Sequence, residues 1–111
     1  MAVEVRRVGQ AVILKLEGRL ALGTAVDQFR ASWSDAINQG ANLVLIDLSN
    51  VTYLDSTGIG TIIRCHSAVK AADGRLRIFG AHGAVRQAFK VTRLDKIFEF
   101  HEDEKSALAS A

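Results

Sequence analysis

The stretch that decides the fold covers residues 43–60 and reads LVLIDLSNVTYLDSTGIG. Its first six residues form an almost unbroken apolar run, which is typical of a central strand covered on both faces. A short loop is expected next, followed by a helix that begins at Ser56 or one of its neighbours. The stretch therefore predicts a buried strand whose C-terminal end leads into a helix. In open α/β sheets, ligands and partners are usually bound at that edge.

The residues that follow predict a crossover to a second parallel strand. The expected helix ends at Gly74, and Arg75–Phe79 reads as the next strand. A strand, a helix and a strand in this order form a right-handed parallel βαβ unit. The helix is expected to carry on one side the residues Ile59, Ile62, Ile63, His66 and Val69.

The N-terminal residues predict a β-hairpin. Val3–Arg6 alternates apolar and polar residues, Gly9-Gln10 is a plausible two-residue turn, and Ala11–Leu16 continues as a second strand. Gly18-Arg19-Leu20 is expected to leave the sheet.

A first helix is expected between this hairpin and the central strand. Thr24 followed by Asp27 resembles a capping box, with Asp in the place usually held by Glu or Gln. Gly40 is expected to end the helix. Its core-facing stripe consists of Val26, Phe29, Trp33 and Ile37.

The C-terminal third predicts a helix over about Gly83–Thr92, a strand over Ile97–Phe100 and a terminal helix over Glu102–Ala109. The fold class is therefore α/β, with a leading hairpin, a central parallel βαβ unit and a mixed sheet of about five strands packed against helices. A chain of 111 residues is expected to form one domain, residues 1–111.

Composition excludes several classes of function. Nearly half of the residues (49%) are hydrophobic, and the net charge is only +2. The basic residues are scattered, whereas nucleic-acid binders concentrate them on one face, so no nucleic-acid partner is expected. No apolar run approaches the about 20 residues needed to cross a bilayer. The lone Cys65 cannot form an internal disulfide, which favours a cytoplasmic location.

Two small groups of basic residues are exceptions to the otherwise scattered distribution of positive charge. Arg75 and Arg77 lie on one face of their strand, and Arg86, Lys90 and Arg93 lie on a later helix. Nearby acidic residues offset them, so they are interpreted as parts of a solvated surface.

Ser56 is the candidate functional residue because of its position. A serine oxygen at a helix start can accept hydrogen bonds from the free amides of the first turn. The same amides and the helix dipole would stabilise a phosphate there. Phosphorylation adds roughly −1.5 to −2 charges, so its effect would fall on a partner docked over the site. On residue type alone, the interpretation of Ser56 as only a helix cap is favoured, because a serine before a helix is usually just a cap.

Gly58 and Gly60 indicate a close approach to the start of the helix. Glycine inside a helix costs up to about 1 kcal/mol relative to alanine, so two within one turn need a reason. The approaching group is either a neighbouring segment of the fold or a partner protein such as a kinase.

Other site chemistries lack their motifs. Gly58-x-Gly60 lacks the third glycine of a dinucleotide fingerprint, and no P-loop is present. Ser56, His66 and Asp47 could form a triad, but no nucleophile-elbow sequence surrounds the serine. The histidines and Cys65 lack metal-ligand spacing. No enzymatic activity, metal or cofactor is therefore expected.

Residues 43–60 resemble the signature of the STAS domains, the family of the anti-sigma factor antagonists. In that family a hydrophobic strand ends in Asp-Leu, and Asp-Ser-Ser/Thr-Gly-Leu/Ile-Gly opens a helix after a loop. Here the two parts read Ile46-Asp47-Leu48 and Asp55–Gly60. The resemblance covers essentially the whole chain. It includes Gly18-Arg19-Leu20 with Thr24, Val85–Phe89, Thr92, Leu94 and Lys96-Ile97-Phe98.

The resemblance implies a STAS-type mixed sheet with about four helices, and a partner-switching function. The unphosphorylated antagonist binds an anti-sigma factor and so frees a sigma factor. The anti-sigma factor is often a serine kinase that phosphorylates the serine matching Ser56, and a serine phosphatase restores the active form. Thr57 is a secondary acceptor candidate. The implied partner-binding residues are Leu20, Ala21, Asp55, Ser56, Thr57, Gly58, Ile59 and Gly60.

The roles implied for single residues differ. Asp55 would help to shape the loop, while Gly58 and Gly60 would let the partner come close. Ala21 departs from the acidic residue that many members carry directly after the Gly-x-Leu turn, which leaves the identity of the partner open.

Two alternatives remain. The first is a constitutive interaction subunit of a lipid-transport or stressosome-type complex, in which the hydroxyl of Ser56 is never modified. The second is nucleotide binding at the strand end, which no phosphate-binding motif supports. A monomer is the simpler expectation for the oligomeric state.

Overall fold

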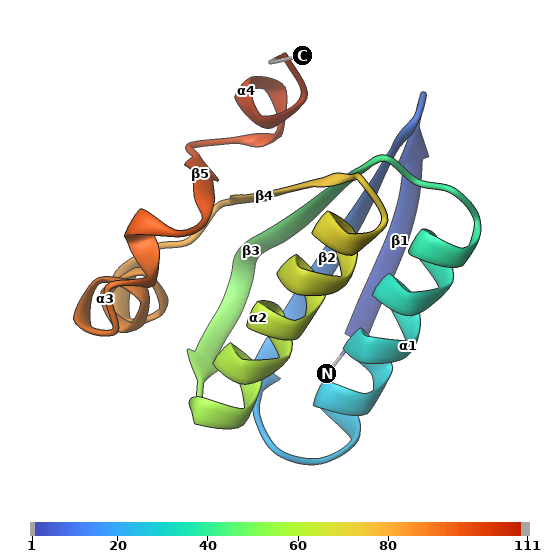
Figure 1. Cartoon of the computed structure of the whole chain (residues 1–111). Coiled ribbons are helices and arrows are strands. Elements are labelled where there is room, and N and C mark those ends of the chain that lie inside the picture. The colour runs from blue at the N-terminus through green and yellow to red at the C-terminus, as the bar shows by residue number, and fades with distance from the viewer. Residues whose placement is uncertain (1, 110–111) are drawn as a thin grey trace.

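The computed structural model describes residues 2–109 and contains a five-stranded mixed sheet flanked by four helices (Figure 1). The strands lie in the order β1-β2-β3-β4-β5; β1 runs antiparallel to β2, and the other neighbouring pairs are parallel. This confirms the predicted fold class. The elements are β1 (Ala2–Val8), β2 (Ala11–Leu20), α1 (Thr24–Asn38), β3 (Leu43–Leu54), α2 (Ser56–Ala71), β4 (Arg75–Phe79), α3 (Gly83–Val91), a 3₁₀ turn (Leu94–Lys96), β5 (Glu99–His101) and α4 (Glu104–Ala109).

The leading hairpin is confirmed, with a longer second strand than predicted. Gly9 has a φ of 60°, which the turn requires. The expectation that Gly18-Arg19-Leu20 leaves the sheet is wrong, because β2 continues to Leu20, which pairs with Leu54 of β3. Two register shifts, after Lys15 and after Gly18, absorb the irregular pairing along this extension.

β3 is also longer than predicted, and this length positions the candidate site. Residues 43–47 pair with both β2 and β4, whereas the rest of the strand pairs with β2 alone. The expected loop after Leu48 is therefore strand up to Leu54. Val51 and Leu54 are buried in this part of the strand. Their packing in the core stabilises the extended conformation beyond the polar Ser49 and Asn50.

α1 and α2 lie side by side on one face of the sheet (Figure 1). Val26, Phe29 and Trp33 of α1 are buried, as their spacing predicts. The predicted capping box is wrong, because α1 begins at Thr24 itself and Gly23 is the N-cap, with no capping bond from a side chain. Gly23 has a φ of 127°, a conformation that a threonine would rarely adopt.

α3 and the C-terminal segment extend the same core. Val85, Phe89 and Phe98 belong to the cluster that also contains residues of α1 and α2. The predicted strand 97–100 is displaced, because residues 94–96 form a 3₁₀ turn and β5 begins only at Glu99.

The second face of the sheet is covered by α4, which is shorter than predicted. Ala107 of α4 packs against Ile13, Leu45 and Phe79. Interpreting Arg77 as part of a solvated positive surface is wrong, because its residue is only 1% exposed. Its guanidinium forms an ion pair with Glu99 and donates from Nη1 to the Ala107 carbonyl at 2.8 Å. Arg77 therefore joins β4, β5 and α4.

Within residues 2–109, no helix has the length and the apolar character needed to cross a membrane.

Candidate functional site

The site is built around the start of α2, where Asp55 is the N-cap. Its Oδ1 accepts a hydrogen bond from the Gly58 amide at 2.8 Å, as expected of an aspartate cap. Ser56 is therefore the first helical residue and does not cap α2. Its side chain is exposed, and its hydroxyl forms no hydrogen bond to another residue within 2–109. The structure thus leaves this hydroxyl accessible and unbonded.

Asp55 also holds the neighbouring loop. Its Oδ2 accepts from the Leu22 amide at 3.1 Å, and its own amide donates to the Leu20 carbonyl at 3.4 Å. The hydrogen bonds from Gly58 and Leu22 lower the pKa of this carboxyl group below its usual value. The carboxylate therefore joins the end of β2 to the start of α2, in agreement with the implied role of Asp55 in shaping the loop.

The two glycines have different surroundings. A Cβ on Gly58 would lie 2.2 Å from the Leu20 carbonyl oxygen, so the approaching group at this position belongs to the fold itself. Apart from its chain neighbours and the nearby backbone of α2, a Cβ on Gly60 would meet only Arg64 Nη1 among residues 2–109, at 4.0 Å. Gly58 and Leu20 are buried and hold the loop against the helix, whereas Gly60 is partly exposed.

The other candidates lie at the surface. Ala21, Asp55, Thr57 and Ile59 are half-buried around the exposed Ser56. Thr57 accepts through its carbonyl from Thr61 Oγ1 at 3.0 Å, a bond within the first turns of the helix.

Three exposed apolar side chains near the site were not among the predicted residues. Leu22 is 80% exposed, Tyr53 41% and Ile63 40%. Arg19 stacks over the ring of Tyr53, with its Cζ 4.2 Å from the ring centroid. Ile63 was assigned to the buried side of the helix, and its exposure corrects that assignment.

A catalytic triad is not assembled here. Asp47 lies on β3 between Ile46 and Leu48, both of which face the core beneath α1 and α2, so its side chain points to the opposite face of the sheet. There it accepts from the Ser49 amide at 2.9 Å and from the Ser49 hydroxyl at 2.6 Å. Residues 2–109 also contain no group of three or more side chains suited to hold a metal ion.

Relatives by sequence carry one recurring description. An anti-sigma-B factor antagonist from Staphylococcus epidermidis is 31% identical over 64 residues, which cover 58% of this chain and 59% of that protein. The matched region thus spans about three fifths of the length of that relative.

Solved structures share the fold over nearly the whole chain. SpoIIAA, described as a Bacillus cell fate determinant in the phosphorylated form, has a TM-score of 0.74 and 26% identity, and the match covers 95% of this chain and 96% of that one. An anti-sigma factor antagonist from Mycobacterium paratuberculosis has a TM-score of 0.86 and 20% identity, with 96% and 90% covered. The family model described as STAS domain matches residues 2–107. This protein belongs to the STAS domain family.

Proposed function

We propose that this protein is an anti-sigma factor antagonist controlled by phosphorylation of Ser56. The unphosphorylated form binds an anti-sigma factor that is also a serine kinase, and this binding frees a sigma factor. Phosphorylation ends the binding, and a serine phosphatase restores it. The protein acts as a cytoplasmic monomer and has no catalytic activity of its own.

The position of Ser56 is the observation that carries this proposal. Asp55 caps α2, so modification of Ser56 removes no capping bond from the helix. The Ser56 side chain is exposed at the first helical position. A phosphate there lies at the positive end of the helix dipole, which offsets part of its charge.

The surface around Ser56 provides a reason for the loss of binding. Leu22, Tyr53 and Ile63 expose apolar side chains near it, and apolar contact area is the usual source of affinity in an interface. A phosphate adds roughly −1.5 to −2 charges, which a partner would have to desolvate on docking. The names of the relatives support the same proposal, since two are anti-sigma factor antagonists and one is described in a phosphorylated form.

The test combines phosphate transfer with binding. Each kinase-type anti-sigma factor encoded in the same genome is incubated with the protein and ATP, and intact mass and peptide fragmentation locate the phosphate. We expect one phosphate on Ser56, its absence in Ser56→Ala, and its retention in Thr57→Ala. Transfer that persists unchanged in Ser56→Ala would refute the assignment of the acceptor.

Binding to the same partners is then measured by calorimetry. We expect Ser56→Ala to bind like the unmodified protein and Ser56→Asp to bind at least about tenfold more weakly, a change of roughly 1.4 kcal/mol. Ser67→Asp is the matched control, because Ser67 is an exposed serine farther along α2. Equal binding by all variants, without phosphate transfer, would favour a constitutive subunit of a lipid-transport or stressosome-type complex.

A further inference from the structure

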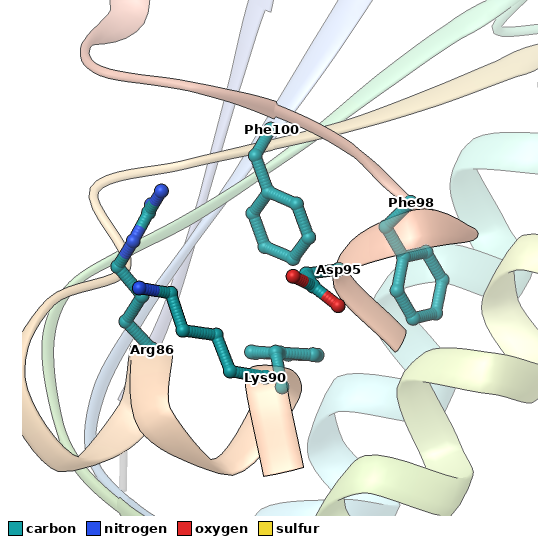
Figure 2. Close-up of a pocket in the computed structure, with 6 residues that line it drawn as sticks. Arg86, Lys90, Asp95, Phe98 and Phe100 are labelled. Atoms are coloured by element: carbon teal, nitrogen blue, oxygen red, sulfur yellow. The ribbon is translucent and has the colours of Figure 1, made fainter. Parts of the chain in front are cut away.

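A cavity of about 260 Å³ lies between α3 and the segment that leads from the 3₁₀ turn into β5 (Figure 2). Its volume is close to the lower end of the range for small-molecule sites in proteins. It is lined by Arg86, Phe89, Lys90, Asp95, Phe98 and Phe100. None of these residues belongs to the surface around Ser56 described above.

The apolar part of the cavity is aromatic. Phe89 and Phe100 meet edge to face with ring centroids 5.2 Å apart, and Phe89 and Phe98 meet in the same way at 5.9 Å. Phe98 and Phe100 are 6.3 Å apart, so the three rings form one connected cluster. Phe100 is half-buried, which leaves part of its ring available to a flat apolar group.

Two cations lie beside these rings. Arg86 and Lys90 are four residues apart on α3 and so lie one turn apart on the same face of the helix. Figure 2 shows both side chains on the same side of the cavity, across from Phe100 and Asp95. Like charges at this spacing repel each other, so an anion held between them would relieve a destabilising contact.

These cations are not neutralised within the fold. Across residues 2–109, neither Arg86 nor Lys90 takes part in an ion pair. Arg77 and Arg75, on nearby β4, contrast with them because both pair with Glu99. Among the described residues, Asp95 supplies the single carboxylate that lines the cavity, so one positive charge remains in excess.

We propose that this cavity binds a small aromatic carboxylate. The flat ring of the ligand packs against Phe98 and Phe100, and its carboxylate lies between Arg86 and Lys90, where it accepts charge-assisted hydrogen bonds. The volume limits the ligand to one or two fused rings. Asp95 disfavours ligands with two negative charges, such as a phosphate monoester, because it repels the second charge.

The test uses naphthalene-2-carboxylate as the probe, with naphthalene-2-carboxamide as its neutral counterpart. Binding to the full chain is measured by calorimetry and by chemical-shift perturbation. We expect the carboxylate to bind saturably and the carboxamide to bind roughly tenfold more weakly, because the carboxamide carries no negative charge and so forms no ion pair with Arg86 or Lys90. The His66 ring meets Phe98 edge to face at a centroid distance of 5.1 Å, so its signals should shift with occupancy.

Variants then locate the binding site. Arg86→Gln and Lys90→Gln should each weaken carboxylate binding by roughly tenfold, whereas Asp95→Asn should strengthen it. Arg30→Gln is the matched control, because Arg30 is an exposed arginine on α1. Thermal unfolding of each variant confirms that it remains folded.

Three outcomes would overturn the proposal. The first is no saturable binding up to the solubility limit of the probe. The second is equal affinity for the carboxylate and the carboxamide. The third is that Arg86→Gln and Lys90→Gln bind naphthalene-2-carboxylate as tightly as the Arg30→Gln control does.

Discussion

The carbonyl oxygen of Leu20 lies where a side chain on residue 58 would begin. A Cβ built on Gly58 would be 2.2 Å from this oxygen, far inside van der Waals contact. Gly58 therefore lets the end of β2 pack directly onto the first turn of α2. Gly60, two residues later, has no such neighbour, because apart from its chain neighbours and the nearby backbone of α2, the closest described atom to its Cβ position is Arg64 Nη1 at 4.0 Å.

Alanine at the two glycines should have opposite effects on stability. Gly58→Ala forces backbone apart from backbone, and we expect it to lower the free energy of unfolding by about 1–3 kcal/mol. Gly60→Ala removes a helix-interior glycine without a clash, and we expect it to raise that free energy by up to about 1 kcal/mol. Urea unfolding measures both, and a loss of the same size in the two variants would contradict this account.

Removal of the Asp55 carboxylate should destabilise the protein and release the loop. Asp55→Ala removes the bonds to the amides of Gly58 and Leu22, so we expect a lower urea midpoint and faster hydrogen exchange at Leu22. Asp27→Ala is the control, because Asp27 is likewise a carboxylate near the start of a helix, in the first turn of α1, where no side chain forms a capping bond. Equal midpoints for the two variants would show that the cap contributes nothing.

The Asp55 contribution should also depend on pH. The pKa of this carboxyl group is lower in the folded state than in the unfolded state, mainly because of the bond from Gly58. Its stabilisation is therefore complete above the unfolded-state pKa and disappears as the pH falls through the lower folded-state value. The ordinary pKa of an aspartate, which applies to the unfolded state, is 3.8. The difference in free energy of unfolding between the unmodified protein and Asp55→Ala should thus narrow as the pH falls below this value. A difference that stays constant down to the acid unfolding range would contradict this linkage.

Loss of the carboxylate that faces Arg77 should destabilise the C-terminal part of the chain. Glu99→Gln leaves the buried guanidinium with the Ala107 carbonyl but no anion, and we expect a loss of about 1–3 kcal/mol. The loss of stability should lie toward the lower end of this range, because the Glu99 side chain is 39% exposed and solvent screens its charge. Glu104→Gln, which removes an exposed pair with Arg6, is the control and should change stability little. Urea unfolding measures the free energy of unfolding of both variants. Equal losses in Glu99→Gln and Glu104→Gln would contradict a special contribution of the pair with Arg77.

The thiol of Cys65 should be unreactive in the folded protein. The residue is fully buried, and burial raises the pKa of the thiol to about 12. The thiolate is the reactive form, so we expect negligible labelling by a disulfide reagent at pH 8 and stoichiometric labelling in urea. Labelling of the native protein at the rate seen in urea would show that α2 opens far more easily than its packing indicates.

The fold was predictable where apolar residues repeat with a clear period. The first helix and the central strand were predictable from their buried apolar residues, which are Val26, Phe29 and Trp33 in the helix and most of the run from Leu43 to Leu48 in the strand. Prediction failed where one-residue boundaries matter. Asp55 and Ser56 are both good N-cap residues, and only the observed bond to the Gly58 amide separates their roles.

Local sequence patterns do not predict contacts between residues that lie far apart in the sequence. Arg77 looked like a surface cation, because its partner Glu99 lies 22 residues farther along the chain. The sequence does not predict the extension of β3 past Leu48 for a related reason, since this part of the strand pairs with β2, more than 30 residues earlier. The cavity at Arg86 likewise depends on α3 lying against Phe98 and Phe100, which no local pattern encodes.

The double attachment of Asp55 has a kinetic consequence for the proposed recognition of a partner at Ser56. Because one carboxylate fixes both the Leu22 loop and the start of α2, the surface near Ser56 is ordered before any partner arrives. Such a preorganised surface spends little conformational entropy on binding. Encounter is then limited mainly by diffusion and orientation, so differences in affinity between partners should arise from how long each complex lasts.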